Sequence, residues 1–186
     1  MVFIRDLLFV FWFFGPAGLS NLAAFLASKI SFLKPLNQPV DFGLHFRKKR
    51  ILGTHKTIRG FIAGILVAIL IVYLEVFLYQ NIRWVRTIIP IDYTHINPVL
   101  LGFLLGFGAL AGDSVKSFFK RQKNVPPGKS WVPFDQVDYI AGGVLLSALY
   151  IQLNLWQYLL LFFMYLFLHP FNTILGYLFK LRKEPL

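Results

Sequence analysis

The sequence has no cysteine, only 8 Asp and Glu among its 186 residues, and a charged fraction of 15%. The absence of cysteine excludes disulfide bonds, thiolate metal sites and cysteine nucleophiles. Soluble domains are typically about 25% charged, so the low charge argues against a soluble protein. What the chain has in excess is hydrophobic residues, at 57%, with 18% aromatic residues. This composition favours an all-α integral membrane protein.

The scarcity of acidic residues leaves a net charge of +11, because the chain has 19 Lys and Arg. In a soluble protein this balance would suggest a nucleic-acid partner. In a membrane protein the same charge lies in segments beside the bilayer, and we expect no nucleic acid. Anionic lipid head groups or an anionic soluble substrate are the ligands that it favours.

Five apolar segments are candidates for membrane-spanning helices, which need about 20 mostly apolar residues. They cover about residues 7–32, 58–79, 98–111, 139–153 and 156–179. The third and fourth are short, so we expect neighbouring protein to support their ends. The sequence contains no repeat and no second compositional region, which predicts one multi-pass domain over residues 1–186.

The basic residues are distributed unequally between the two sides of this arrangement. Sixteen of the 19 lie in the 28–59 loop, the 116–129 segment and the C-terminal tail, which share one side. The positive-inside rule therefore predicts an outside N-terminus and a cytoplasmic C-terminus. Segments of about 33–57 and 112–138 are then two functional cytoplasmic loops. The same charge bias favours an uncleaved first span over a secretory signal.

Small residues recur at a spacing of four in three places. The pairs are Gly60 with Gly64, Gly102 with Gly106, and Gly108 with Gly112. Small residues at this spacing let helices approach closely within lipid. The pattern predicts close helix packing within the bundle.

The third apolar segment continues into a polar stretch that ends at residue 121. If the stretch is helical, its polar residues at i, i+3, i+4, i+7 and i+8 share one face. These residues are Asp113, Lys116, Ser117, Lys120 and Arg121. A solvated helix end is the simpler interpretation, but an acid at the membrane end of a span is costly and usually functional.

A second acidic group leads into the fourth segment. Asp135 and Asp138 are three residues apart and follow a proline-rich loop that turns the chain back. Both could therefore converge on Asp113 across the loop. Carboxylate oxygens are the ligands that Mg²⁺ takes, with waters and substrate phosphate completing its shell. We predict Mg²⁺ binding by the three aspartates, with pairing to nearby lysines as the alternative.

The start of the second apolar segment carries Lys56, Thr57 and Arg59. The free amides and the dipole at a helix N-terminus favour an anion. A Lys and an Arg in the same turn would add a clamp for phosphate.

These residues suit the transfer of a phosphorus group between two anionic substrates, a reaction catalysed mainly by positioning and charge neutralisation. A phosphate monoester nucleophile has a second pKa of about 6, so it is ionised at neutral pH without a general base. An anion or phosphate-ester transporter and a lipid-binding structural protein are the alternatives. Transporters commonly have internal repeats and broken helices, which the sequence does not clearly show.

Several motifs resemble the signature of the CTP-dependent phosphatidate cytidylyltransferases, and others resemble its archaeal branch, the CDP-archaeol synthases. The signature motifs are Gly112-Asp113, Ser117, Lys120-Arg121 and Asp135-Gln136-x-Asp138. The archaeal motifs are Pro16-Ala17 with Asn21, Pro39-x-Asp41-x-Gly43 and Lys56-Thr57-x-Arg59-Gly60. The chain lacks the His-Gly-Gly stretch and the Asp-Arg pair of the bacterial enzymes, and it is shorter.

The resemblance implies a membrane enzyme whose active site faces the cytoplasm. The implied reaction is cytidylyl transfer from CTP to an isoprenoid diether lipid phosphate, 2,3-bis-O-geranylgeranyl-glycerol 1-phosphate, with release of pyrophosphate. Phosphatidate is the alternative lipid. The family requires Mg²⁺, and the oligomeric state stays open.

The resemblance also implies roles for individual residues. Asp113, Asp135 and Asp138 would hold metal and, with Lys116, act in catalysis. The remaining residues would bind phosphates or the nucleotide, or line the cavity: Lys56, Thr57, Arg59, Ser117, Lys120, Arg121, Asn21 and Asp41.

Overall fold

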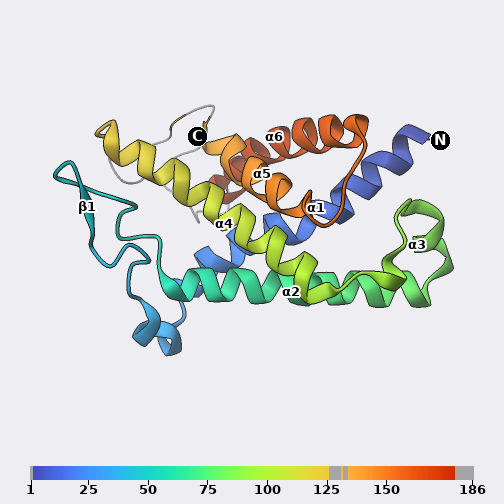
Figure 1. The fold of residues 1–186 in the computed structure, drawn as a ribbon, viewed down its shortest axis with the longest axis horizontal. Helices are drawn as coiled ribbons and strands as arrows, with labels where there is room; N and C mark the ends of the chain where they lie inside the picture. Colours follow the sequence, from blue (N-terminus) through green and yellow to red (C-terminus); the bar gives the residue numbers. More distant parts are fainter. Residues whose placement is uncertain (1, 126–130, 132–133, 179–186) are drawn as a thin grey trace.

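The protein is a bundle of helices, as the sequence predicts (Figure 1). The computed structural model describes residues 2–125, 131 and 134–178. Its α-helices are α1 (Val2–Ala27), α2 (Ile58–Asn81), α3 (Arg83–Ile88), α4 (Pro98–Gln122), α5 (Phe134–Ser147) and α6 (Leu155–Leu178). Two 3₁₀ helices, η1 (Ser31–Leu36) and η2 (Tyr93–His95), and one hairpin of β1 (His45–Phe46) and β2 (Lys49–Arg50) complete the described elements.

Among the described residues, three helices are long and apolar enough to cross a membrane. They cover Phe3–Ala27, Ile58–Asn81 and Pro98–Gln122, and α6 adds a shorter apolar stretch, Leu155–Leu168. Helix α5 has 14 residues and α3 has 6, both fewer than the roughly 20 that a full span requires. The protein is thus an all-α membrane protein, and a count of five spans stays a prediction.

Two helices end earlier than the apolar segments that predict them. The first was expected over residues 7–32, but α1 begins at Val2 and ends at Ala27, where the Ser28 hydroxyl donates to the Phe25 carbonyl at 2.6 Å. The fourth was expected over residues 139–153, but α5 ends at Ser147 and a turn follows. Apolar residues resume at Ile30 after the short Ser28-Lys29 turn and continue directly past the end of α5, so apolar length extends the predicted segments beyond the helices.

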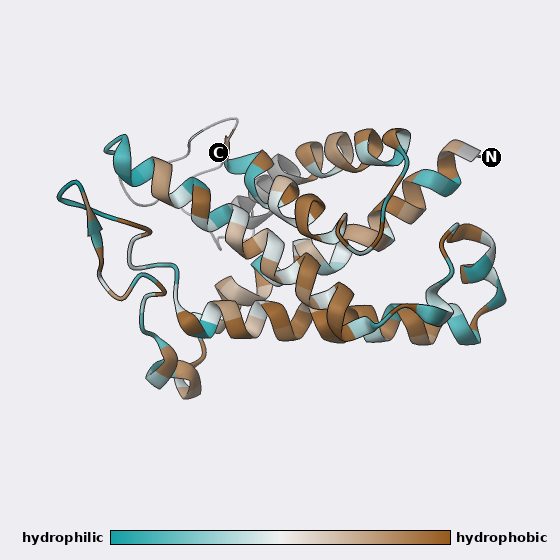
Figure 2. Cartoon of the chain, in the orientation of Figure 1, coloured by the Kyte–Doolittle hydropathy of each residue, from teal (hydrophilic) through white to brown (hydrophobic). Residues whose placement is uncertain are grey.

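Hydrophilic residues lie at both ends of the bundle, and at one end they cover the hairpin and the C-terminal end of α4 (Figure 2). The hairpin and the C-terminal end of α4 lie together there, and Lys49 Nζ donates a 2.6 Å hydrogen bond to the Gln122 carbonyl. The two segments predicted to be cytoplasmic therefore meet at this end over their described parts. That this end faces the cytoplasm stays a prediction.

Helix α4 packs between α2 and α5 at glycines. A Cβ atom at Gly102 would lie 2.5 Å from Ile69 Cα on α2, and one at Gly112 would lie 2.1 Å from the Asp138 carbonyl oxygen on α5. Both distances are shorter than real Cβ contacts, so the helix backbones touch where no side chain fits. The close packing predicted from the glycine spacing is confirmed.

We expect Gly142→Ala to destabilise the protein, because its Cβ would lie 2.1 Å from the Gly108 carbonyl oxygen and push α4 and α5 apart. Overpacking of this kind typically costs about 1–3 kcal/mol. Gly15→Ala is the matched control, since a Cβ there meets nothing within 4 Å and alanine favours the helix. Thermal unfolding of the two variants in detergent should show a lower midpoint for Gly142→Ala alone; equal midpoints would contradict the contact.

Candidate functional site

A polar cavity of about 190 Å³ lies where α4 meets the segment before α2. The face of α4 predicted from helical spacing contributes all five of its residues, and the other wall comes from residues 52–56. The lining residues are Leu52, Gly53, Thr54, His55, Lys56, Asp113, Lys116, Ser117, Lys120 and Arg121. Leu52, Gly53, Thr54 and His55 were not predicted from the sequence; their only local signal is that they directly precede Lys56.

The segment before α2 is held against the chain that follows η1. Pro39 pairs with Thr57 in an antiparallel bridge, and the Val40 amide donates to the Lys56 carbonyl at 2.8 Å. The Ile58 amide donates to the Gln38 carbonyl at 2.9 Å. These bonds fix the backbone of Lys56, so its side chain approaches α4 from a defined direction.

Asp41 holds this loop together and does not line the cavity, in contrast to the expectation. Its carboxylate is buried and accepts hydrogen bonds from the amides of Gly43, Leu52 and Gly53 at 3.1, 2.9 and 3.2 Å. It also pairs with Arg50 at 3.0 Å. Burial acts to raise the pKa of Asp41, but these hydrogen bonds outweigh it and the pKa is lowered. A buried carboxylate with four donors organises the backbone of the cavity wall.

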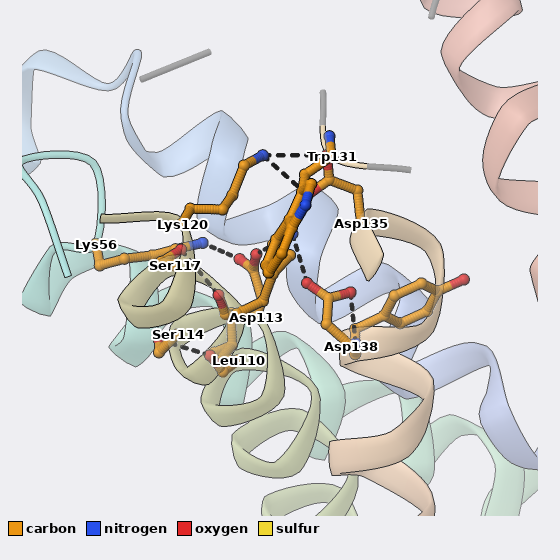
Figure 3. Close-up of polar contacts among 11 residues, drawn as sticks. Lys56, Leu110, Asp113, Ser114, Ser117, Lys120, Trp131, Asp135 and Asp138 are labelled. Carbon is orange, nitrogen blue, oxygen red and sulfur yellow. Dashed lines mark hydrogen bonds and ion pairs between the residues drawn. The ribbon is translucent and has the colours of Figure 1, made fainter. Parts of the chain in front are cut away.

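Three carboxylates and three lysines meet beside the cavity. Lys116 Nζ lies 3.0 Å from Asp113 Oδ1, 3.0 Å from Asp135 Oδ1 and 2.5 Å from Asp138 Oδ2. In Figure 3 these carboxylates stand on the facing sides of α4 and α5. The convergence expected across the loop therefore occurs around a lysine ammonium.

Two further lysines close this cluster from outside. Lys56 Nζ donates to Asp113 Oδ2, and Lys120 Nζ donates to both oxygens of Asp135 at 3.0 and 3.1 Å (Figure 3). The Trp131 amide adds a 2.6 Å bond to Asp135. The cluster is compact and balanced in charge, as partly buried ionised groups require.

Burial is the main influence on the titration of this cluster. Burial, together with the charge of Lys116, lowers the pKa of Lys56 to about 8. It also raises the pKa of Asp138. Burial acts in the same upward direction on Asp135, but the Trp131 amide and the Lys116 charge outweigh it, so the pKa of Asp135 is lowered.

Three residues predicted to bind the nucleotide or line the cavity lie elsewhere. Thr57 is buried and caps α2, its hydroxyl accepting from the Gly60 amide at 3.4 Å. Arg59 is buried in the first turn of α2, and its Nε has no hydrogen-bond partner in the described part of the chain. Asn21 lies on α1, outside the cavity wall.

The residues predicted to bind metal have the right chemistry, but a lysine stands between them. Within residues 2–125, 131 and 134–178, no three acidic or histidine side chains close into a metal-binding group by themselves. The oxygens of Asp113, Asp135 and Asp138 nevertheless all face one cation, the Lys116 ammonium. This donor set fits a hard divalent cation, and metal binding stays a prediction.

Comparison with known proteins decides the family. The model of the CarS-like CDP-archaeol synthase family matches residues 3–185. The chain belongs to this family. The CDP-archaeol synthase of Methanospirillum hungatei is 34% identical over 171 residues, which are 88% of this chain and 99% of that protein. The one from Methanopyrus kandleri is 35% identical over 177 residues, 94% of this chain and 90% of that protein.

A solved structure of an intramembrane enzyme for archaeal membrane lipid biosynthesis has the same fold. It superposes with a TM-score of 0.67 and 25% sequence identity, covering 88% of this chain and 92% of the other. Membership in the CDP-archaeol synthase family thus agrees with the bundle of long apolar helices. The polar cavity and the carboxylate–lysine cluster are the candidate site at one end of this bundle.

We expect Asp41→Ala to open the loop that forms the cavity wall, because it removes the acceptor of four donors. A loss of about 1.4 kcal/mol in local stability would raise the exposure of the 45–50 hairpin about tenfold. Limited trypsin digestion, which cuts after the basic residues 47–50, measures this exposure.

Asp92→Ala is the control, since Asp92 also accepts a backbone amide, that of Thr94, but in a different loop. Its cleavage rate within residues 47–50 should equal that of the unmodified protein. Equal rates for Asp41→Ala would show that the carboxylate does not organise the loop.

Proposed function

We propose that this protein is a CTP-dependent cytidylyltransferase that activates an isoprenoid diether lipid phosphate. Its reaction would join the cytidylyl group of CTP to 2,3-bis-O-geranylgeranyl-glycerol 1-phosphate, yielding the CDP-activated lipid and pyrophosphate. The relatives named CDP-archaeol synthase support this proposal. The observation that carries it is the carboxylate–lysine cluster next to a basic cavity at the polar end of a membrane bundle.

The cavity suits the phosphates of a nucleotide. Lys56, Lys116, Lys120 and Arg121 all line it, so several positive charges face one small volume. At about 190 Å³ the cavity is smaller than the roughly 300–1,000 Å³ of typical small-molecule pockets. We therefore assign it to the polyphosphate part of the nucleotide and leave the base to neighbouring surface.

The lipid phosphate needs little chemical activation in this site. Its second ionisation has a pKa of about 6, so at neutral pH an oxygen is ready to attack the α-phosphorus of CTP. The attack forms a new P–O bond and breaks the bond to the pyrophosphate leaving group. The work left to the protein is to bring two anions together and offset their repulsion, which is the role of the lysines and Arg121.

A divalent cation, Mg²⁺, fits the same proposal. Asp113, Asp135 and Asp138 would hold it, because their carboxylates already face one cation from two helices. When bound, it would supply charge neutralisation to the phosphates of the nucleotide. The lysines would then be available to the lipid phosphate and to pyrophosphate.

The location of the site matches a lipid substrate. The protein is a membrane protein whose long apolar helices end where α4 becomes polar. A lipid that stays in its leaflet would present its phosphate at this boundary, where a soluble nucleotide also has access. Since the basic segments gather there, the positive-inside rule assigns this end to the cytoplasm.

We expect Asp113→Asn, Asp135→Asn and Asp138→Asn each to lower turnover at least about 100-fold, because each removes a charge from the proposed cation site. Purified protein in lipid nanodiscs, with CTP, Mg²⁺ and the diether lipid phosphate, should release pyrophosphate. Asp92→Asn, at a distant exposed aspartate, is the control and should keep full activity.

Parallel assays with other nucleotides and another lipid phosphate distinguish this proposal from its alternatives. Replacing CTP by ATP, GTP or UTP should give little pyrophosphate, and phosphatidate should be a poorer acceptor than the diether lipid. Full activity in the three aspartate variants would overturn the site. No pyrophosphate release by correctly folded protein, with phosphate flux into liposomes instead, would replace the enzyme by a transporter.

A further inference from the structure

The ammonium of Lys116 stands in the position where a cation would be held. Its Nζ lies 3.0, 3.0 and 2.5 Å from oxygens of Asp113, Asp135 and Asp138. These three contacts are ion pairs between one ammonium and three carboxylates. One positive charge thus faces acids from two helices, Asp113 on α4 and Asp135 and Asp138 on α5.

The other two lysines of the cluster have narrower contacts. Lys56 pairs with Asp113, and Lys120 pairs with Asp135. In the described part of the chain, Lys116 is the lysine paired with Asp138, and Asp138 is the least exposed of the three carboxylates, at 5% of its side chain. Removing the Lys116 charge therefore leaves the most buried acid without its ion pair.

Lys116 also belongs to the cavity wall. Its side chain is a flexible four-carbon stem with a point charge at the tip. Rotation about its single bonds can direct this charge toward the carboxylates or toward the cavity. From one backbone position on α4, it reaches the carboxylates and borders the space assigned to phosphates.

We propose that Lys116 is an internal counter-ion that competes with the divalent cation for the three carboxylates and is passed to the phosphates when that cation binds. This inference rests on the proposed function for the identity of the two ligands. A divalent cation and an ammonium cannot share the same oxygens without strong repulsion. Binding of the metal therefore releases Lys116, and the released charge raises the affinity for the nucleotide.

The exchange has two consequences. Before substrate arrives, Lys116 keeps three partly buried carboxylates from repelling one another, so the site is held assembled. When substrate arrives, metal and nucleotide each raise the affinity of the protein for the other, because coupling between two sites is reciprocal. A purely structural lysine would perform the first role without the second.

The test measures Mn²⁺ binding to the purified full-length protein without nucleotide, by the electron paramagnetic resonance signal of free Mn²⁺. Lys116→Met should bind Mn²⁺ at least about tenfold more tightly than the unmodified protein, because its competitor is gone. Lys116→Arg, which keeps the charge, should bind Mn²⁺ as the unmodified protein does. Lys34→Met, at an exposed lysine in η1, is the matched control and should change nothing.

Equal or weaker Mn²⁺ binding by Lys116→Met would overturn the competition. If that variant fails to fold by size-exclusion chromatography, Lys116→Gln, which keeps a polar group at the position, replaces it with the same expected gain. A failure of the Lys116→Met and Lys116→Gln variants to bind Mn²⁺ would overturn the inference as well.

A second measurement tests the coupling. Addition of CTP should strengthen Mn²⁺ binding by the unmodified protein, and this strengthening should shrink at least several-fold in Lys116→Met. If CTP strengthens Mn²⁺ binding by the same factor in both proteins, Lys116 is only a structural counter-ion.

These binding results are independent of turnover. A protein with the expected Mn²⁺ pattern that releases no pyrophosphate from CTP and the lipid would disprove the proposed function alone. An active protein whose Lys116→Met variant gains no Mn²⁺ affinity would disprove this inference alone.

Discussion

The backbone contact between α4 and α5 is the constraint on which the site depends. A Cβ at Gly112 would lie 2.1 Å from the carbonyl oxygen of Asp138, so the two helices touch at this point. Asp113 follows Gly112 in the chain, and Asp138 supplies the touching carbonyl itself. The contact that packs the bundle therefore also sets the separation between two of the three carboxylates. A larger residue at Gly112 would act on packing and on the site together.

Bringing carboxylates together in a partly buried place has an electrostatic cost that nearby cations must offset. Here the compensation comes from two sources in the chain. Lys116 and Lys120 belong to α4, whereas Lys56 arrives on a loop that is organised by the buried carboxylate of Asp41. The loop is thus part of the site through its architecture as well as through Lys56. Because the lysines come from both α4 and the loop before α2, motif residues that are far apart in the sequence line the same cavity.

Local patterns predicted much of this arrangement. Helical spacing placed the polar residues of α4 on one face, and all of them line the cavity. Glycines four residues apart predicted close helix contacts, which Gly102 and Gly112 make. Apolar length predicted the helices but misplaced the ends of α1 and α5. Hydrophobic residues resume soon after the turn that follows α1 and continue into the turn that follows α5. The motif also predicted that Asp41 lines the cavity. In the structure its carboxylate instead accepts hydrogen bonds from backbone amides of its own loop.

The sequence by itself determined the class of the protein, its long apolar helices and the residues that share a helix face, since composition and periodicity are local properties of the chain. Only the tertiary structure decided which groups pair. It brought residues 52–55 into the cavity wall, committed the Thr57 hydroxyl to a helix cap, and set Lys116 among three carboxylates from two helices. Ion pairing depends on distances of a few ångströms between separate elements, and those distances follow from how the helices pack.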